Sequence, residues 1–77
     1  MAFSELEMVV LTRRVPEHGL MPGDLGTIVQ MFDDGVAEVE FVTASGMTQA
    51  VVTLSPPDIR SVEPTDLVAV RRFGKSA

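Results

Sequence analysis

Short apolar runs separated by turn residues repeat along the whole chain, and this pattern predicts an all-β protein. Residues 7–12 and 25–32 are rich in β-branched and aliphatic side chains, as strands usually are. Within 37–41 apolar and acidic residues alternate strictly, which is the period of two expected of a half-buried antiparallel strand. Residues 47–54 and 59–63 complete a predicted set of five short strands.

The segments between these runs carry the residues that turns require. Gly35 and Gly46 each come shortly before a new run, which predicts two hairpins because glycine adopts positive φ at little cost. Residues 15–23 contain two prolines and two glycines and predict a long irregular loop. Residues 55–58 include two adjacent prolines and predict a 3₁₀ turn before the last strand. Together these elements predict a small SH3-like barrel of five antiparallel strands.

The second run is apolar at successive positions, so its alternation is weaker than that of the third. Ile28, Val29 and Met31 would place apolar side chains on both faces. This favours a strand that is buried on both sides or bent across the barrel. Two of the four phenylalanines, Phe32 and Phe41, are expected in the core.

The segment 20–29 combines Pro-Gly-Asp with Gly-Thr and two β-branched residues, which is typical of a turn that leads into a strand. Asp24 is expected to accept a backbone hydrogen bond in this turn rather than to bind a ligand amine. The glycine spacing does not fit a nucleotide-binding fingerprint. The residues predicted to have structural roles in turns are Gly23, Asp24, Gly26, Gly35 and Gly46.

The C-terminal part predicts a separate element. We expect the barrel to occupy residues 1–63, and residues 64–77 to form a further strand or a tail. The valine content of 66–73 favours the strand. We expect this segment to cover a barrel edge or to cross to a second copy, since an exposed apolar edge invites association.

Composition limits the classes of function. A chain of 77 residues makes one domain, and it has no cysteine and one histidine, so we expect no disulfide, no metal site and no cofactor. A net charge of −5 disfavours binding to phosphate backbones, which makes proteins the expected partners and nucleic acid a disfavoured one. The acidic N-terminus and the lack of a long apolar run predict a cytoplasmic protein without a membrane segment.

Four polar residues are candidates for binding, and none for catalysis. Glu17 and His18 lie in the long first loop, where recognition residues are often found. Glu38 and Glu40 form an acidic strip on the third strand. A hydrolase needs two carboxylates in unlike environments, whereas an outward-facing strip is solvated, so we interpret it as a strand face that can receive a basic partner surface.

Several motifs together resemble a known family. They are Val10-Leu11-Thr12, the segment 20–29, Val39-Glu40-Phe41 and Val52-Thr53-Leu54. They resemble a small prokaryotic family of stand-alone SH3-like barrels of uncharacterised function. The run Gly23-Asp24-Leu25-Gly26-Thr27 is also similar to an element of KOW modules and of the nitrile hydratase β-subunit barrel.

We expect a non-enzymatic protein-binding or accessory role, in which the long first loop and the acidic strip contact a protein partner. The resemblance permits an antitoxin or immunity role with a toxin as partner. The alternative is a KOW-like nucleic-acid or ribosome-associated module. That alternative requires the arginines to gather on one face and binding to weaken steeply with salt.

Overall fold

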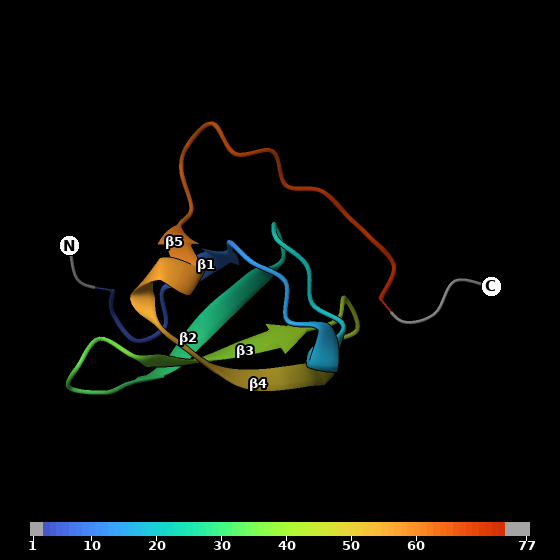
Figure 1. The fold of residues 1–77 in the computed structure, drawn as a ribbon. Helices are drawn as coiled ribbons and strands as arrows, with labels where there is room; N and C mark the ends of the chain where they lie inside the picture. Colours follow the sequence, from blue (N-terminus) through green and yellow to red (C-terminus); the bar gives the residue numbers. More distant parts are fainter. Residues whose placement is uncertain (1–2, 74–77) are drawn as a thin grey trace.

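The structure, a computed structural model, describes residues 3–73, which form one open antiparallel sheet (Figure 1). The expected all-β fold is confirmed. Two 3₁₀ helices lie in the connections of this part of the chain, η1 (Pro16–His18) and η2 (Pro56–Asp58), the second where a turn was predicted. The strands are β1 (Met8–Leu11), β2 (Leu25–Met31), β3 (Ala37–Val42), β4 (Thr48–Leu54) and β5 (Ile59–Ser61).

The strand order is β4-β3-β2-β1-β5, so the first and last strands lie side by side. Val9 of β1 pairs with Gly26 of β2 on one side and with Ser61 of β5 on the other. No ladder joins β4 to β5 within residues 3–73, and the sheet therefore remains open. Along the chain, the elements follow one another as the sequence predicted, with a long first loop, two hairpins and a 3₁₀ turn before the last strand.

The core lies between the curved sheet and the long first loop. Along β3, Ala37, Val39 and Phe41 are buried, while the alternate residues Glu38 and Glu40 are only half-buried, as period-two alternation requires. The core cluster takes residues from every strand and from the first loop: Val9, Leu11, Val15, Leu20, Ile28, Ala37, Val39, Phe41, Ala50, Leu54 and Ile59.

A bulge explains the weak alternation of β2. Ile28 pairs with Val39, but the next partner of β3, Glu38, faces Gln30, so Val29 is an extra residue. An extra residue bends a strand and changes which side chains face the core. Of the two arrangements expected for this run, the bent strand is the one observed. The expectation that Phe32 lies in the core is wrong, because it follows the last residue of β2 and is 41% exposed.

Both hairpins place glycine in the left-handed region. Gly35 has φ 85° and Gly46 has φ 90°, a conformation that residues with a Cβ rarely adopt. The Gly35 amide donates to the Phe32 carbonyl at 3.1 Å, and the Gly46 amide donates to the Thr43 carbonyl at 2.9 Å. These turns set the register of β3 against both of its neighbours.

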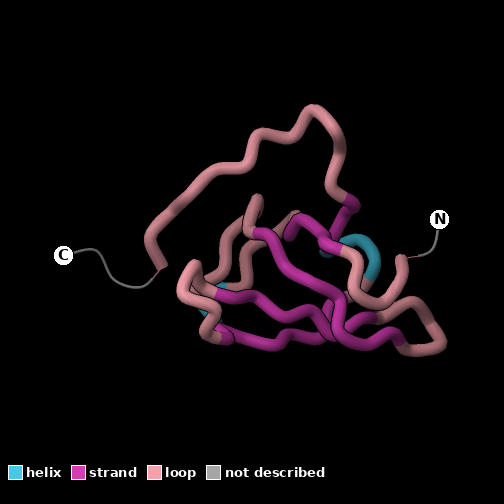
Figure 2. The backbone as a smooth tube through the Cα atoms, turned by 180° about the vertical axis from the view of Figure 1, so that it is seen from behind, coloured by secondary structure: helices cyan, strands magenta, loops and turns pink. Residues whose placement is uncertain are grey.

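Residues 62–73 form a tail rather than a strand. The tail leaves β5, arches over the sheet and returns toward the first loop, and the view from behind shows it as loop throughout (Figures 1 and 2). A strand expected over 66–73 therefore does not form in the described chain, because no neighbouring backbone lies in register with it. Residues 74–77, the rest of the predicted C-terminal element, lie outside the described residues. No helix within 3–73 has the length and apolar character needed to cross a membrane.

Candidate functional site

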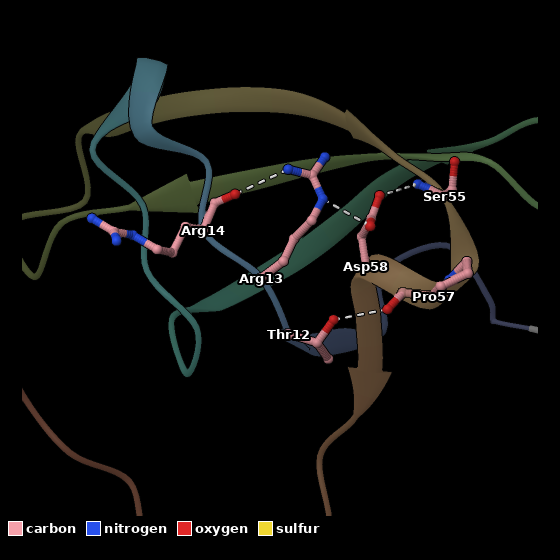
Figure 3. Close-up of polar contacts among 6 residues, drawn as sticks. All are labelled: Thr12, Arg13, Arg14, Ser55, Pro57 and Asp58. Atoms are coloured by element: carbon pink, nitrogen blue, oxygen red, sulfur yellow. Dashed lines mark hydrogen bonds and ion pairs between the residues drawn. The ribbon is translucent and has the colours of Figure 1, made fainter.

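A cluster of polar contacts fixes the base of the first loop, residues 12–24, against η2 (Figure 3). The Thr12 hydroxyl donates to the Pro57 carbonyl at 2.8 Å. Arg13 donates through Nε to Oδ1 of Asp58 at 2.8 Å, and the other oxygen of Asp58 accepts from the Ser55 amide at 3.1 Å. Asp58 therefore caps its own 3₁₀ turn and holds the start of the loop.

The middle of the loop is a small hairpin that is anchored in the core. Val15 and Leu20 exchange two backbone hydrogen bonds, at 3.0 and 3.1 Å, and both side chains are buried. Between them η1 turns the chain, and Gly19 follows with φ 69°. The loop is thus a packed structure with fixed ends rather than a loose connection.

Asp24 organises the return of the loop into β2. Its Oδ2 accepts from the Met21 amide at 2.8 Å, which is a side-chain-to-backbone bond that closes a turn. Gly23, with φ 97°, occupies the position before it. The backbone then joins the sheet, since the Leu11 amide donates to the Asp24 carbonyl at 2.9 Å.

The tail binds to this loop through Arg71. The Arg71 guanidinium donates from Nε to Oδ1 of Asp24 at 2.8 Å and from Nη2 to Oδ2 at 2.6 Å. Its Nη2 also donates to the Gly19 carbonyl at 2.9 Å. A two-pronged contact of this kind suits the planar guanidinium and is stronger than a contact between neutral groups.

Phe73 adds an apolar contact next to the ion pair. Its ring lies directly on Gly19: a Cβ built at that glycine would come within 2.8 Å of the Phe73 Cε1 atom. Gly19 therefore serves two purposes, since it adopts a positive φ and leaves space for the ring. Arg71 and Phe73 together form the docked end of the tail.

The charge of Asp24 is stabilised by its neighbours. Burial of the carboxyl raises its pKa, but hydrogen bonds from Arg71 and from the Met21 amide, and the positive charge of Arg71, lower it by more. The net pKa of Asp24 lies below its ordinary value, so the group is ionised at neutral pH. An ionised, partly buried carboxylate is a specific acceptor for a guanidinium.

A second ion pair holds the beginning of the tail. Arg60 of β5 donates to both oxygens of Asp66 at 2.9 Å, and the Glu63 amide also donates to Asp66 at 2.7 Å. The hydrogen bond from Arg60 lowers the pKa of Asp66 to about 2. The tail is therefore anchored near both of its ends.

A groove of about 440 Å³ lies beside the docked end of the tail. Its lining includes Leu20, Gly23 and Asp24 from the first loop, and Leu25 and Phe41 from β2 and β3. The remaining lining residues come from the β3–β4 region and from the tail: Val42, Thr43, Ala44, Gln49, Ala69, Val70, Arg71 and Phe73. The lining is mostly apolar, and its polar groups include Thr43, Gln49 and the Asp24–Arg71 ion pair.

The four predicted binding residues are not brought together. Glu17 and His18 form part of η1 and are exposed at the tip of the loop. Glu38 and Glu40 lie on the sheet face opposite to Val39 and Phe41, where Thr53 donates to Glu38 at 2.9 Å and Thr48 donates to Glu40. The core-facing loop and the acidic strip are thus on different sides of the sheet.

Gly26 lies within β2 rather than in the turn. A Cβ there would come within 2.5 Å of the Val39 Cγ1 atom and 2.9 Å of the Phe41 Cε2 atom. The position requires a residue without a side chain because the neighbouring strand packs across it. Its role is close packing under the groove, which differs from the turn role that was predicted.

Sequence reasoning missed Arg71 and Phe73. It favoured a strand over residues 66–73 and assigned no contact to either side chain, although Arg-Arg-Phe at the end of a valine-rich run marked an amphipathic end. Across residues 3–73, no three histidine, cysteine or acidic side chains are grouped closely enough to hold a metal ion.

Comparison with known proteins gives one family match. A family model described as "Domain of unknown function (DUF4926)" matches residues 5–61. The match covers the sheet and the first loop and ends at the last residue of β5, so that the tail lies outside it. No curated protein and no solved structure matches the chain.

Proposed function

Because the chain belongs to the DUF4926 family, whose function is unknown, we propose a role from the groove itself: a non-enzymatic protein-binding domain. The groove between the first loop and the β3–β4 hairpin holds an extended segment of a partner protein. The observation that carries this proposal is the docking of the chain's own tail, in which Arg71 pairs with Asp24 through two hydrogen bonds. The tail lines one side of the groove and shows what the Asp24 and Gly19 surface at its end accepts; a partner segment takes the place of the tail there.

The chemistry of the groove defines the segment. Asp24 is 17% exposed in its side chain with Arg71 docked on it, and its Oδ2 atom also accepts from the Met21 amide, so the loop itself helps to orient the carboxylate. Because Gly19 has no side chain, an aromatic ring packs on its backbone without steric conflict. The preferred partner segment therefore has an arginine followed two residues later by an aromatic residue, as in Arg71 and Phe73.

The finer expectation of an antitoxin or immunity role belongs to the same proposal. A toxin that presents an exposed arginine-aromatic segment would be a suitable partner. Capture from the source cell with the full chain, in parallel with an Asp24→Asn form, tests this role. A toxin recovered by the first and not by the second supports it.

The KOW-like alternative has less support. Arg13, Arg60 and Arg71 are each paired with an aspartate within residues 3–73, so that part of their charge is already neutralised at the surface. Phosphate binding draws its strength from uncompensated Lys and Arg charges. The acidic strip at Glu38 and Glu40 would repel a phosphate backbone further.

A peptide titration tests the proposal. The full chain with Arg71→Ala and Phe73→Ala loses the tail's own anchors, and a synthetic peptide with the sequence of residues 66–73 then serves as the probe. We expect binding at the groove, seen by NMR as shifts at Gly19, Gly23 and Phe41. Adding Asp24→Asn, which keeps an acceptor for the Met21 amide, should weaken binding about 10- to 100-fold through loss of the charged hydrogen bonds.

Two outcomes would contradict the proposal. One is equal peptide affinity for the chains with and without the Asp24→Asn substitution; the other is a set of shifts confined to Glu38 and Glu40. A peptide with lysine in place of its first arginine is the matched control. It should bind more weakly, since an ammonium group cannot make the two-pronged contact.

A further inference from the structure

The middle of the tail is poorly covered in a single chain. Leu67, Val68 and Val70 are 93%, 79% and 96% exposed, although they are flanked by two ion pairs that hold the tail in place. Such a contiguous run of exposed apolar side chains is unusual on a monomer and marks an interaction surface.

The backbone of the same segment also lacks hydrogen-bond partners. In the described part of the chain, the last backbone–backbone hydrogen bond of the tail is donated by Asp66 to Glu63. Residues 67–70 form neither a helix nor a turn (Figure 1) and are rich in β-branched side chains, which favour strands. An apolar segment with open backbone groups is a template for pairing with another strand.

We propose that two copies of this chain exchange residues 62–73. Arg71 of each copy then pairs with Asp24 of the other, Phe73 of each covers Gly19 of the other, and the two 67–70 segments pair as antiparallel strands. The occupant is a second copy because the docked end already shows that this sequence complements this groove in charge and shape. Exchange conserves every contact of the docked end, gives the 67–70 backbone hydrogen-bond partners, and places the apolar side chains of the two segments next to one another.

The hinge suits such an exchange. The tail departs from β5 at residues 62–65, which include Pro64 and are exposed. A change in this short segment redirects the whole tail, at the cost of the exposed contacts that Asp66 makes with Arg60 and with the Glu63 amide. Exchange of identical elements between protomers is a low-cost route to a dimer. A net charge of −5 on each chain opposes the approach of two copies, so added salt should favour the dimer.

Light scattering on the full chain gives the first test. In each chain, its own tail competes with the tail of a second copy and is present at an effective concentration in the millimolar range. The sample is therefore followed up to about 1 mM. We expect the mass to rise from 8.3 kDa toward twice that value, and to rise further with salt. A mass of 8.3 kDa at every concentration would overturn the proposal.

A mixed-label NMR sample then identifies the contact. One population is isotopically labelled and the other is not, and both have the natural sequence. We expect cross-relaxation between the Phe73 ring of one population and the Gly19 α-protons of the other. A dimer without this intermolecular signal would overturn tail exchange while leaving dimerisation itself established.

A charge swap provides an independent test. A chain with Asp24→Arg has arginine at both positions of the contact, and a second chain with Arg71→Asp has aspartate at both. Each variant alone therefore brings like charges together, whether the tail docks on its own chain or on another copy of the same variant. When the two are mixed, exchange restores opposite charges at both contacts, so we expect a 1:1 heterodimer and no homodimer of either. Folding of each variant is checked by amide dispersion, and a pair of folded variants that fails to associate would contradict the proposal.

This inference goes beyond the proposed function and can fail separately from it. If the synthetic tail peptide binds the emptied groove but the full chain stays monomeric, only the exchange is wrong. If the full chain dimerises through its tails but no foreign arginine-aromatic segment binds, the groove serves self-association alone.

Discussion

Gly26 sets the packing beneath the groove by having no side chain. The Val39 and Phe41 side chains of β3 cross the space that a Cβ would occupy, and Phe41 also lines the groove. Its φ is not in the left-handed region, unlike those of Gly23, Gly35 and Gly46. The constraint at this residue is therefore steric contact across strands and not backbone conformation.

Replacing Gly26 with alanine tests this reason. We expect Gly26→Ala to lower the free energy of unfolding by about 1–3 kcal/mol, because overpacking forces β3 side chains out of place. Urea unfolding measures the change. In a chain that already carries Val39→Ala the same substitution should cost less, since the nearest obstructing methyl group is gone. Equal costs in both backgrounds would show that the contact is not the cause.

Leu6 is a second residue with a local constraint. It has φ 72°, the only positive φ of a non-glycine residue within 3–73, and its side chain is 78% exposed. Its amide donates to the Ile28 carbonyl at 2.7 Å, which ties the N-terminal turn to β2. The left-handed conformation of a bulky residue is unfavourable, and this hydrogen bond is the visible reason why it persists.

At the level of elements, short apolar runs bounded by turn residues were sufficient to locate the five strands of the described chain, and strict alternation located one of them. The alternating pattern of 37–41 gave β3 almost to its ends, and the turn glycines Gly35 and Gly46 gave its hairpins. The position of Phe32 was not predictable in this way, because a one-dimensional pattern does not tell whether an aromatic residue belongs to a strand or to the turn after it. The bulge at Val29 explains why the alternation of apolar and polar residues breaks down in β2, shortly before Phe32.

The tail docking was beyond sequence reasoning for a physical reason. Asp24 and Arg71 are 47 residues apart, and no periodicity links an aspartate in a turn to an arginine in a tail. The valine-rich run of 66–73 indicated a strand, but a strand requires a partner that the single chain does not provide. The sequence of residues 66–73 favours a strand, whereas the structure shows a loop. This is the segment that we propose is exchanged between two copies.

Acid should release the tail. The pKa of Asp24 is lowered in the docked state, so its contribution to docking is complete above the ordinary aspartate pKa of about 3.9 and is lost as the pH falls through the lower, docked-state pKa. An NMR titration follows the Gly19 α-protons, which lie beneath the Phe73 ring. We expect their ring-current shift to be constant at neutral pH and to disappear in acid.

Two comparisons separate tail release from global unfolding. The Ile28 methyl groups report the core, and they should keep their native shifts over the part of the titration in which the Gly19 signal first moves. A chain with Arg71→Gln should show no docking shift at any pH. A Gly19 shift that persists to the lowest pH with a native core would contradict a role for the Asp24 charge.

At the scale of the whole molecule, a small open sheet supports one packed loop, and the tail arches over the sheet (Figures 1 and 2). The groove is lined by that loop, the β3–β4 region and the tail. Three aspartates, Asp24, Asp58 and Asp66, have pKa values below the ordinary one, and each is paired with an arginine. These pairs hold the loop base, the beginning of the tail and its docked end. These three ion pairs therefore hold the base of the first loop and the tail in positions that the hydrophobic core alone does not fix.

The central claim is that the surface formed by Asp24 and Gly19, at the end of the groove, is a binding site that the chain's own tail occupies. The most direct measurement compares the affinity of the 66–73 peptide for the natural chain and for the chain with Arg71→Ala and Phe73→Ala, both at micromolar concentration. We expect the natural chain to bind at least about 10-fold more weakly, because its tail competes in cis. Equal affinities for the two chains would contradict the claim.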